Sequence, residues 1–307
     1  VQFYSSPNLK KWTYLSDFGP AGDVQDIWEC PDLLEVPVHN NPGKKKWVLI
    51  NSQQTTMQYF VGEFDGKKFH NENSTKKFYR PDYGPDYYAA VTYNNLPANQ
   101  PPVILGWANN WKYANDIPTF PWKSAMALPR NLVLKKVSNE WILSQQSVIA
   151  LKSLRTNAVE LKNITVAAKK RLSVKSQQLE MELVLQPKQN VISGVRLAVG
   201  KQNVFIIGYD VSSGKLFIDR SGCTNNSFNK NFADLSRYET SLTRVNGKIK
   251  LHIFFDHSIV EVFANDGTTV MTAQLFPEEK DDSIELFSDV GATKFELVKL
   301  WKIKSAW

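Results

Sequence analysis

The chemistry that this sequence could perform rests on a few carboxylates set among aromatic residues. Glu29 stands between Trp28 and Cys30 in a short, otherwise apolar run. A carboxyl group in a strand depleted of water has a raised pKa, because burial disfavours the charged form. A raised pKa allows a carboxylic acid to donate a proton near neutral pH. Glu29 is therefore a candidate general acid, and an ordinary surface position on an edge strand is the alternative interpretation.

A second group of carboxylates and phenols surrounds a Gly-Pro turn. It contains Asp82 and Asp86, with Tyr83 and Tyr87 beside them. Side chains of these types can hydrogen-bond the hydroxyl groups of a sugar, and they also occur in polar surface turns. The residues alone favour neither interpretation.

Two tryptophans, Trp107 and Trp111, follow in a segment that also contains Asn109 and Asn110. Indole faces stack on the apolar CH faces of sugar rings, while amides hydrogen-bond the hydroxyls. Taken alone, packing in the core is the favoured interpretation of this pair.

Other kinds of chemistry lack a signature in this sequence. The four histidines are scattered, no glycine-rich loop precedes a helix, and no Gly-x-Ser-x-Gly motif occurs. The sequence therefore predicts no metal and no cofactor. Carboxylates with aromatic residues remain, and this combination is typical of sugar hydrolysis.

The composition limits the class of protein that must position these residues. The 307 residues include nine Trp, eleven Tyr and seventeen Phe, an aromatic supply that suits a β-rich fold. The net charge of +7 comes from basic residues spread along the chain, so nucleic acid is not a predicted partner. No apolar run approaches the length of a membrane span. The two cysteines, Cys30 and Cys223, are expected to be free thiols.

Short runs with period-two alternation, separated by Gly, Asn, Asp and Pro, predict β-strands along nearly the whole chain. Over residues 1–153 these strands form small clusters of the kind found in propeller blades. Over residues 164–307 the alternation is cleaner and its spacing is typical of an antiparallel β-sandwich. Residues 154–163 are the predicted linker, and a short turn or helix is expected within 152–161.

Several of these segments together resemble glycoside hydrolase family 32, the β-fructosidases, which include invertases, inulinases and levanases. The similar segments occur in the order of the family and cover essentially the whole chain: Trp28–Asp32, Asp82–Ala90, Gly106–Arg130 and His252–Gly267. The resemblance implies an all-β fold, with the C-terminal part of a five-bladed β-propeller followed by an antiparallel β-sandwich. Residues 1–153 would then supply the end of blade two and blades three to five.

The resemblance also implies roles for individual residues. Glu29 would be the acid/base catalyst of a retaining mechanism that cleaves terminal β-fructosyl bonds in a fructan or in sucrose. Substrate-binding roles are implied for eight residues: Trp28, Cys30, Asp82, Tyr83, Asp86, Tyr87, Trp107 and Trp111. Asp32 is expected to cap the turn after Pro31, and Asp256 and Glu261 are expected to be structural. Levan, inulin and sucrose remain open as substrates, as do exo and endo action and the oligomeric state.

Two motifs of the family are absent from the sequence. The nucleophilic Asp of an Asn-Asp-Pro motif and the stabilising Asp of an Arg-Asp-Pro motif have no counterpart. Val1–Trp12 resembles the outer part of blade two, so the chain is expected to be N-terminally truncated and inactive by itself. The intact parent would be the enzyme, secreted or periplasmic as in most of the family. The alternative is a non-catalytic fragment that binds fructans or another partner.

Overall fold

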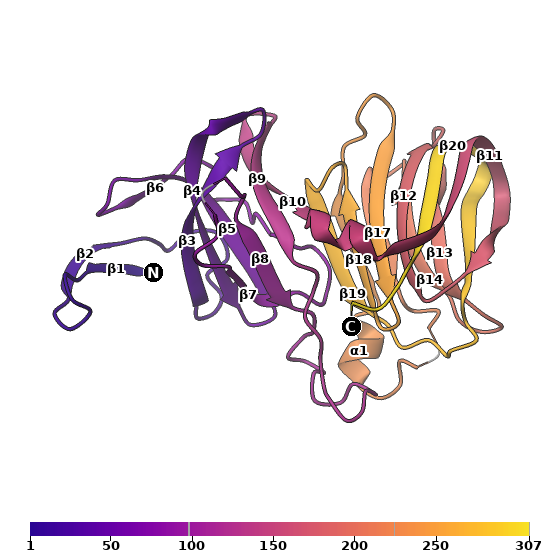
Figure 1. Cartoon of the computed structure of the whole chain (residues 1–307), viewed down its shortest axis with the longest axis horizontal. Helices are drawn as coiled ribbons and strands as arrows, with labels where there is room; N and C mark the ends of the chain where they lie inside the picture. Colours follow the sequence, from indigo (N-terminus) through magenta and orange to yellow (C-terminus); the bar gives the residue numbers. More distant parts are fainter. Residues whose placement is uncertain (98, 224, 307) are drawn as a thin grey trace.

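The computed structural model describes residues 1–97, 99–223 and 225–306, and the regular structure within these ranges is almost entirely β-strand (Figure 1). Two short helices interrupt the strands. They are the 3-10 helix Ile149–Leu154 and α1, Lys230–Asp234, which begins where the side chain of Asn229 accepts hydrogen bonds from two backbone N–H groups. Among the described residues, no helix is long and apolar enough to cross a membrane.

The N-terminal part of the chain consists of small antiparallel sheets. Its strands are β1 (Gln2–Ser5), β2 (Thr13–Asp17), β3 (Glu29–Val38), β4 (Asn41–Gln53), β5 (Thr56–Phe64), β6 (Phe69–Asn71), β7 (Tyr88–Thr92), β8 (Val103–Trp107), β9 (Arg130–Val137) and β10 (Glu140–Ser147). The pair β1–β2 forms a separate hairpin, whereas β3–β6 and β7–β10 each form a four-stranded meander. Among the described residues, the backbone pairing between the two meanders is one parallel bridge, between Val38 and Leu134. Each meander has the form of a propeller blade, as the sequence predicts.

The number of blades differs from the expectation. The end of one blade and three further blades were expected over residues 1–153, and the described residues form one hairpin and two four-stranded blades. The difference lies in the connections. Residues 72–87 and 108–129 are loops with no strand beyond an isolated bridge at Met126, and they take up chain length that the third expected blade would need.

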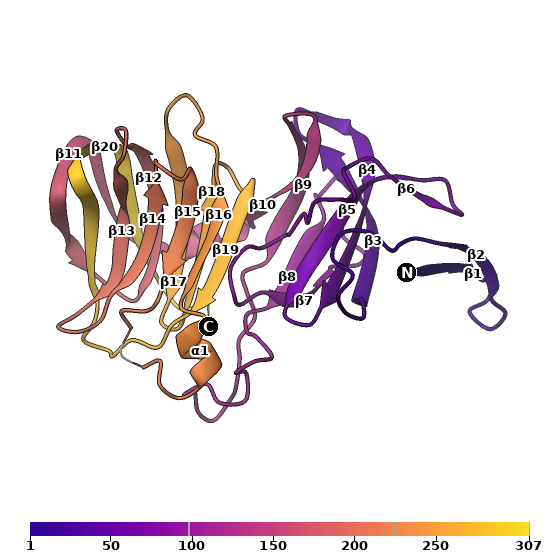
Figure 2. The same cartoon turned by 180° about the vertical axis from the view of Figure 1, so that it is seen from behind.

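The C-terminal part is a sandwich of two antiparallel layers (Figure 2). Its strands are β11 (Arg155–Lys175), β12 (Gln178–Gln186), β13 (Ile192–Val199), β14 (Phe205–Asp210), β15 (Lys215–Asp219), β16 (Arg237–Ser241), β17 (Ile249–Asp256), β18 (Ile259–Ala264), β19 (Thr269–Gln274) and β20 (Ser283–Ile303). The long strands β11 and β20 pass through both layers. The C-terminal half of β20 pairs with β12 and its N-terminal half with β13, so the layers share one continuous apolar core.

Residues 155–163, expected as a linker, are the beginning of β11 and pair with β20. The period-two alternation of apolar and polar residues is interrupted there. The register shifts between Thr156 and Val159, and Asn157 has a φ of 49°. A bulge of this kind adds a residue to one strand and breaks the period-two pattern. The short helix lies just before this segment, at residues 149–154. Cys30 and Cys223 are both free, as predicted.

Candidate functional site

Glu29 is the first residue of β3, and its carboxylate is exposed at the end of the strand. It accepts a hydrogen bond from the phenol of Tyr88, the first residue of β7. The water-depleted strand interior expected for Glu29 is therefore absent. Burial, followed by the hydrogen bond to Glu29, raises the pKa of Tyr88. The phenol thus keeps its proton at neutral pH and acts as a donor that holds the Glu29 carboxylate.

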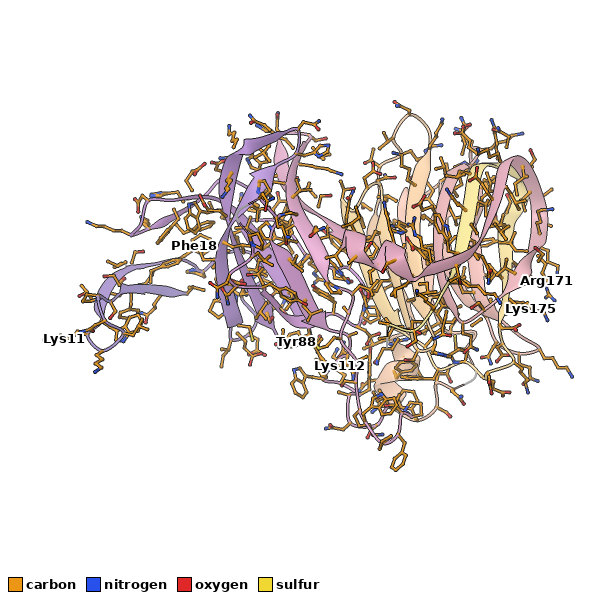
Figure 3. The ribbon with its side chains drawn as sticks, viewed as in Figure 1. Lys11, Phe18, Tyr88, Lys112, Arg171 and Lys175 are labelled. Atoms are coloured by element: carbon orange, nitrogen blue, oxygen red, sulfur yellow. The ribbon has the colours of Figure 1, made fainter. Side chains whose placement is uncertain are left out.

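Two predicted aromatic residues extend this pair. Trp107 lies directly opposite Tyr88 in the β7–β8 ladder, so the two side chains share one face of the sheet. The ring of Trp111 contacts that of Trp107, with 4.8 Å between the centroids, and Trp111 is 60% exposed. Tyr88 and Lys112, the neighbour of Trp111, are labelled in Figure 3 toward the lower edge of the N-terminal part. We call Glu29, Tyr88, Trp107 and Trp111 the Glu29 site.

Cys30 follows Glu29 directly and is exposed. Its backbone has a φ of 47°, in the left-handed region that residues other than glycine rarely adopt. Strained backbone of this kind is common next to functional side chains, where it sets the direction of a neighbouring residue. Cys30 therefore lies beside the Glu29 site, and its substrate contact stays a prediction.

The loop of residues 108–129, which contains Trp111, carries two further aromatic residues for which no role was predicted. Phe120 is 90% exposed and Trp122 is 65% exposed. Large aromatic side chains are seldom so exposed, and these two rings are candidates for a binding surface. Their position beside Pro121 in a polar segment was the available signal. No role was predicted for Tyr88 either, although it lies within Asp82–Ala90, one of the segments that resemble the family.

Trp28 does not join the Glu29 site. Its indole N–H donates to the carbonyl of Asp23 at 2.9 Å, and its ring packs against Phe18 and Phe60. Trp28 thus fills a small aromatic core in the N-terminal part. The role in substrate binding that the resemblance implied for it finds no support in its surroundings.

Asp82 and Asp86 lie against the edge strand β19 of the sandwich. Asp82 accepts the backbone N–H of Thr272 at 2.9 Å, and Asp86 accepts that of Gln274 at 2.7 Å. Between them the backbone N–H of Tyr83 donates to a carbonyl of the same strand at 2.8 Å. Residues 82–86 therefore complete the hydrogen bonding of an edge strand, and we call this segment the clasp.

Two buried arginines hold the carboxylates of the clasp. Arg130 pairs with Asp82 at 3.0 Å and with Glu261 of the sandwich at 2.7 Å. Arg220 of the sandwich pairs with Asp86 at 2.8 Å. All five side chains are nearly inaccessible to solvent.

The remaining predicted residues belong to the same junction of the two parts. Tyr83 packs on the core of the sandwich, and the Tyr87 ring lies 4.0 Å from the Arg130 guanidinium. The expectation that Asp82, Tyr83, Asp86 and Tyr87 bind substrate is therefore not supported by their positions. The carboxylates of Asp82 and Asp86 are satisfied by arginines and strand donors that are distant in sequence. Glu261 is structural, as expected.

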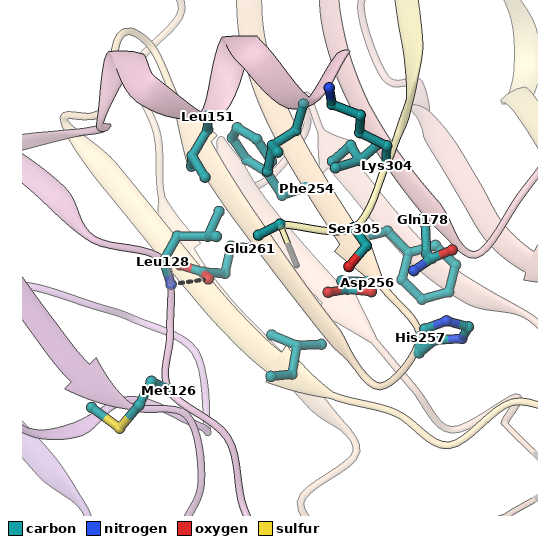
Figure 4. Close-up of a pocket in the computed structure, with 15 residues that line it drawn as sticks. Met126, Leu128, Leu151, Gln178, Phe254, Asp256, His257, Glu261, Lys304 and Ser305 are labelled. Atoms are coloured by element: carbon teal, nitrogen blue, oxygen red, sulfur yellow. Dashed lines mark hydrogen bonds between the residues drawn. The ribbon is translucent and has the colours of Figure 1, made fainter. Parts of the chain in front are cut away.

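An apolar cavity of about 440 Å³ lies at the junction of the two parts, and no residue of the Glu29 site is among those that line it (Figure 4). Leu128, Leu151 and Phe254 supply apolar walls, and Asp256 and His257 stand among the polar lining residues. The backbone N–H of Leu128 donates to Glu261 at 2.6 Å on one side of it. None of the residues predicted to bind substrate lines this cavity.

A cluster of metal-ligand types occurs in the sandwich. Side-chain atoms of Glu180, Glu182 and His252 lie within 4.8 Å of one another. Arg155 donates two hydrogen bonds to Glu180, at 2.5 and 2.6 Å, and His252 lies 2.5 Å from the same carboxylate. Side chains of the protein therefore already bind the buried Glu180 carboxylate, and the cluster has the character of a structural ion pair.

We expect Glu180→Gln to lower stability in a pH-dependent way. Burial acts to raise the pKa of Glu180, but the hydrogen bonds from Arg155 and His252 outweigh it, and the pKa lies below its ordinary value of 4.5. The ionised carboxylate thus adds stability above about pH 4.5, and this is lost as the pH falls through the lowered value. The free energy of unfolding at pH 7, measured with urea, should fall by about 1–3 kcal/mol.

The decrease in the free energy of unfolding caused by Glu180→Gln should become smaller as the pH is lowered from 5 to 3. Glu239→Gln is the matched control, because Glu239 forms an exposed pair with Lys215, and its effect should stay below about 1 kcal/mol. A loss for Glu180→Gln that is equal at pH 3 and pH 7 would contradict the assigned charge interaction.

The comparisons with known proteins agree with this architecture. The glycosyl hydrolases family 32 N-terminal domain matches residues 1–146, and the family 32 C-terminal domain matches residues 150–302. Levanase of Bacillus subtilis is 38% identical over all of this chain and 47% of its own length. Extracellular exo-inulinase of Aspergillus awamori is 34% identical over all of this chain and 60% of its own length. The chain belongs to glycosyl hydrolase family 32.

Solved structures of the family share the fold. The crystal structure of the Aspergillus awamori exo-inulinase matches with a TM-score of 0.89 and 34% identity, over 100% of this chain and 62% of that one. β-Fructofuranosidase from Schwanniomyces occidentalis, complexed with fructosyl-erythritol, matches with a TM-score of 0.86 and 26% identity, over 99% of this chain and 65% of that one. The fold is thus all-β, with part of a β-propeller followed by a β-sandwich, as predicted. The chain spans about half the length of its curated levanase relative.

Proposed function

We propose that this chain supplies the general acid/base and part of the sugar-binding surface of a retaining β-fructosidase. The observation that carries the proposal is the exposed Glu29 carboxylate, held by Tyr88 beside Trp107 and Trp111 in a family 32 chain. The relatives named levanase and exo-inulinase support a fructan or a sucrose-type sugar as the substrate class.

In this mechanism Glu29 protonates the leaving oxygen and then, as a carboxylate, takes a proton from the attacking water. Tyr88 keeps one carboxylate oxygen of Glu29 in a fixed position, which leaves the other oxygen free to face the substrate. The exposed face of Trp111 offers a stacking surface for a sugar ring. A retaining mechanism also needs a nucleophilic carboxylate about 5–5.5 Å from the acid.

We further propose that the 307-residue chain does not release fructose by itself. The sequence contains neither the Asn-Asp-Pro nor the Arg-Asp-Pro motif, from which the family takes its nucleophile and its stabilising aspartate. Purified chain incubated with levan, inulin or sucrose should release no fructose above the buffer blank. Fructose release that scales with the concentration of this chain would contradict the proposal.

The role of Glu29 is tested in a fusion that places a segment carrying both motifs, taken from a family relative, before Val1. We expect this fusion to release fructose and Glu29→Gln to lower its kcat/KM by about 10²–10⁴, the usual contribution of a general acid/base. Glu35→Gln is the matched control, because Glu35 lies exposed on the same strand and pairs with Lys45, and its activity should stay within twofold of the parent. Full activity of Glu29→Gln would overturn the assignment.

The alternative is a chain that binds fructans without cleaving them. It predicts that the fusion also stays inactive while the chain still binds levan or inulin. An extracellular location is part of the proposal, and the relatives named extracellular exo-inulinases support it.

A further inference from the structure

Strands β3 and β7 come from different meanders, yet side chains join them at two points. β3 pairs with β4 and β7 pairs with β8, and within the described residues no backbone ladder connects β3 to β7. The first link is the hydrogen bond from Tyr88 to Glu29. The second lies further along both strands, where Asp32 meets Thr92. The carboxylate oxygen Oδ2 of Asp32 accepts the Thr92 hydroxyl at 2.6 Å and the Thr92 backbone N–H at 2.9 Å.

Both strands bulge between these two links. The register of β3 against β4 shifts between Glu29 and Asp32, and that of β7 against β8 shifts between Tyr88 and Val91. Cys30 and Ala89, the residues after Glu29 and Tyr88, each have a φ of 47°. Such a conformation costs a residue other than glycine about 1–3 kcal/mol, so surrounding contacts must maintain it. Bulges redirect neighbouring side chains, and here they do so in both partners of the Glu29–Tyr88 pair.

The position of the Asp32–Thr92 link explains what maintains this geometry. Glu29 and Tyr88 are the first residues of their strands. Tyr88 is buried in the apolar core of its meander, whereas Glu29 is exposed, so packing fixes Tyr88 but not the beginning of β3. The Asp32 carboxylate receives two donors from one residue, and charge-assisted hydrogen bonds of this kind are stronger than neutral ones. Asp32 was expected to cap the turn after Pro31, whereas its carboxylate bonds Thr92 in the next blade.

We propose that Asp32, acting through Thr92, is a positioning residue that fixes the spacing of β3 and β7 and thereby holds Glu29 against Tyr88. The inference rests on the proposed function in one respect, because it gives the acid/base a fixed direction. The contact itself is a property of this chain and can be measured without any activity. Asp32 touches no reacting atom in this arrangement.

The test follows the Tyr88 phenol by NMR in the 307-residue chain labelled with ¹³C at tyrosine Cζ. The signal that disappears in Tyr88→Phe is assigned to Tyr88, and Glu29→Ala gives its position when the acceptor is lost. We expect Asp32→Ala to move the Tyr88 signal most of the way to the Glu29→Ala position. Thr92→Val, which keeps the backbone donor, should move it part of the way, and Thr92→Ser should leave it at the wild-type position.

Asp65→Ala is the matched control, because Asp65 accepts backbone N–H groups in an exposed turn of the same meander, and it should leave the Tyr88 signal unchanged. A Tyr88 signal that stays in place in Asp32→Ala, or moves only together with the other tyrosine signals, overturns the proposal.

The fusion described above separates this proposal from the proposed function. In an active fusion, Asp32→Ala should lower kcat about tenfold and leave KM within twofold, because the sugar contacts remain. If the fusion is inactive, the proposed function fails, while the NMR series still decides whether Asp32 holds Glu29 against Tyr88.

Discussion

Replacement of Arg130 by methionine should lower the free energy of unfolding by about 3–5 kcal/mol, the cost of removing one partner from a buried ion pair. Methionine retains much of the volume but none of the five donors of the guanidinium. The carboxylates of Asp82 and Glu261 would stay buried, at 1% and 3% side-chain exposure, without their cation. Since domains are stable by only about 5–15 kcal/mol, this loss is a large part of the total.

Urea unfolding at pH 7, followed by tryptophan fluorescence, measures this loss. Arg171→Met is the matched control. Arg171 also pairs with a glutamate, but its own side chain is 59% exposed, and its loss should cost less than about 1 kcal/mol. Equal effects of the two substitutions would show that the burial of Arg130 does not set its contribution.

Gly84→Ala should also lower the free energy of unfolding strongly, by about 3 kcal/mol. This is the upper end of the usual cost of inserting a methyl group into packed structure. Gly84 lies in the clasp, where a Cβ would stand 2.1 Å from the carbonyl oxygen and 2.3 Å from the nitrogen of Thr272. These atoms are backbone and cannot rotate away. The clasp would have to retreat from β19, and its hydrogen bonds to that strand would lengthen.

Gly291→Ala provides the comparison for Gly84→Ala. Gly291 has open space around its Cβ position but a φ of 72°, so its substitution introduces backbone strain without a collision. Its cost should be about 1 kcal/mol, the penalty of the left-handed region. Limited proteolysis of the two variants should also differ, with faster cleavage at the junction in Gly84→Ala. Equal unfolding free energies and cleavage rates would contradict the close approach of the clasp to Thr272.

The architecture followed from local patterns, since alternation and turn residues are properties of neighbouring positions. The runs at 46–50 and 57–62 became β4 and β5, and the cleaner alternation after residue 164 became the sandwich. Glu29 was identified because a carboxylate in an apolar run conflicts with its surroundings. Its geometry was not, because the bulges at Cys30 and Ala89 occur at residues that carry no turn signal.

The carboxylates of the clasp have a role that could not be predicted from the sequence alone. Asp82 and Asp86 have the types that bind sugar hydroxyls, and the same types bind arginine and strand N–H groups. The choice depends on Arg130 and Arg220, which are 48 and 134 residues away from their partners. No local pattern specifies such a pairing, so residue type alone placed two structural carboxylates at a binding site. The predicted number of blades differs from the structure for a related reason, because long loops and strands can have similar composition.

The clasp also has a consequence for the synthesis of the chain. Asp82 and its partner Thr272 are separated by 190 residues. At about 5–20 residues per second, roughly 10–40 s pass on the ribosome between the appearance of the aspartate and that of β19. Throughout this interval the nascent N-terminal part holds Arg130 and two aspartates without the strand that they bind. The rate of translation therefore sets how long these unpaired groups of the junction remain accessible to chaperones and to other nascent chains.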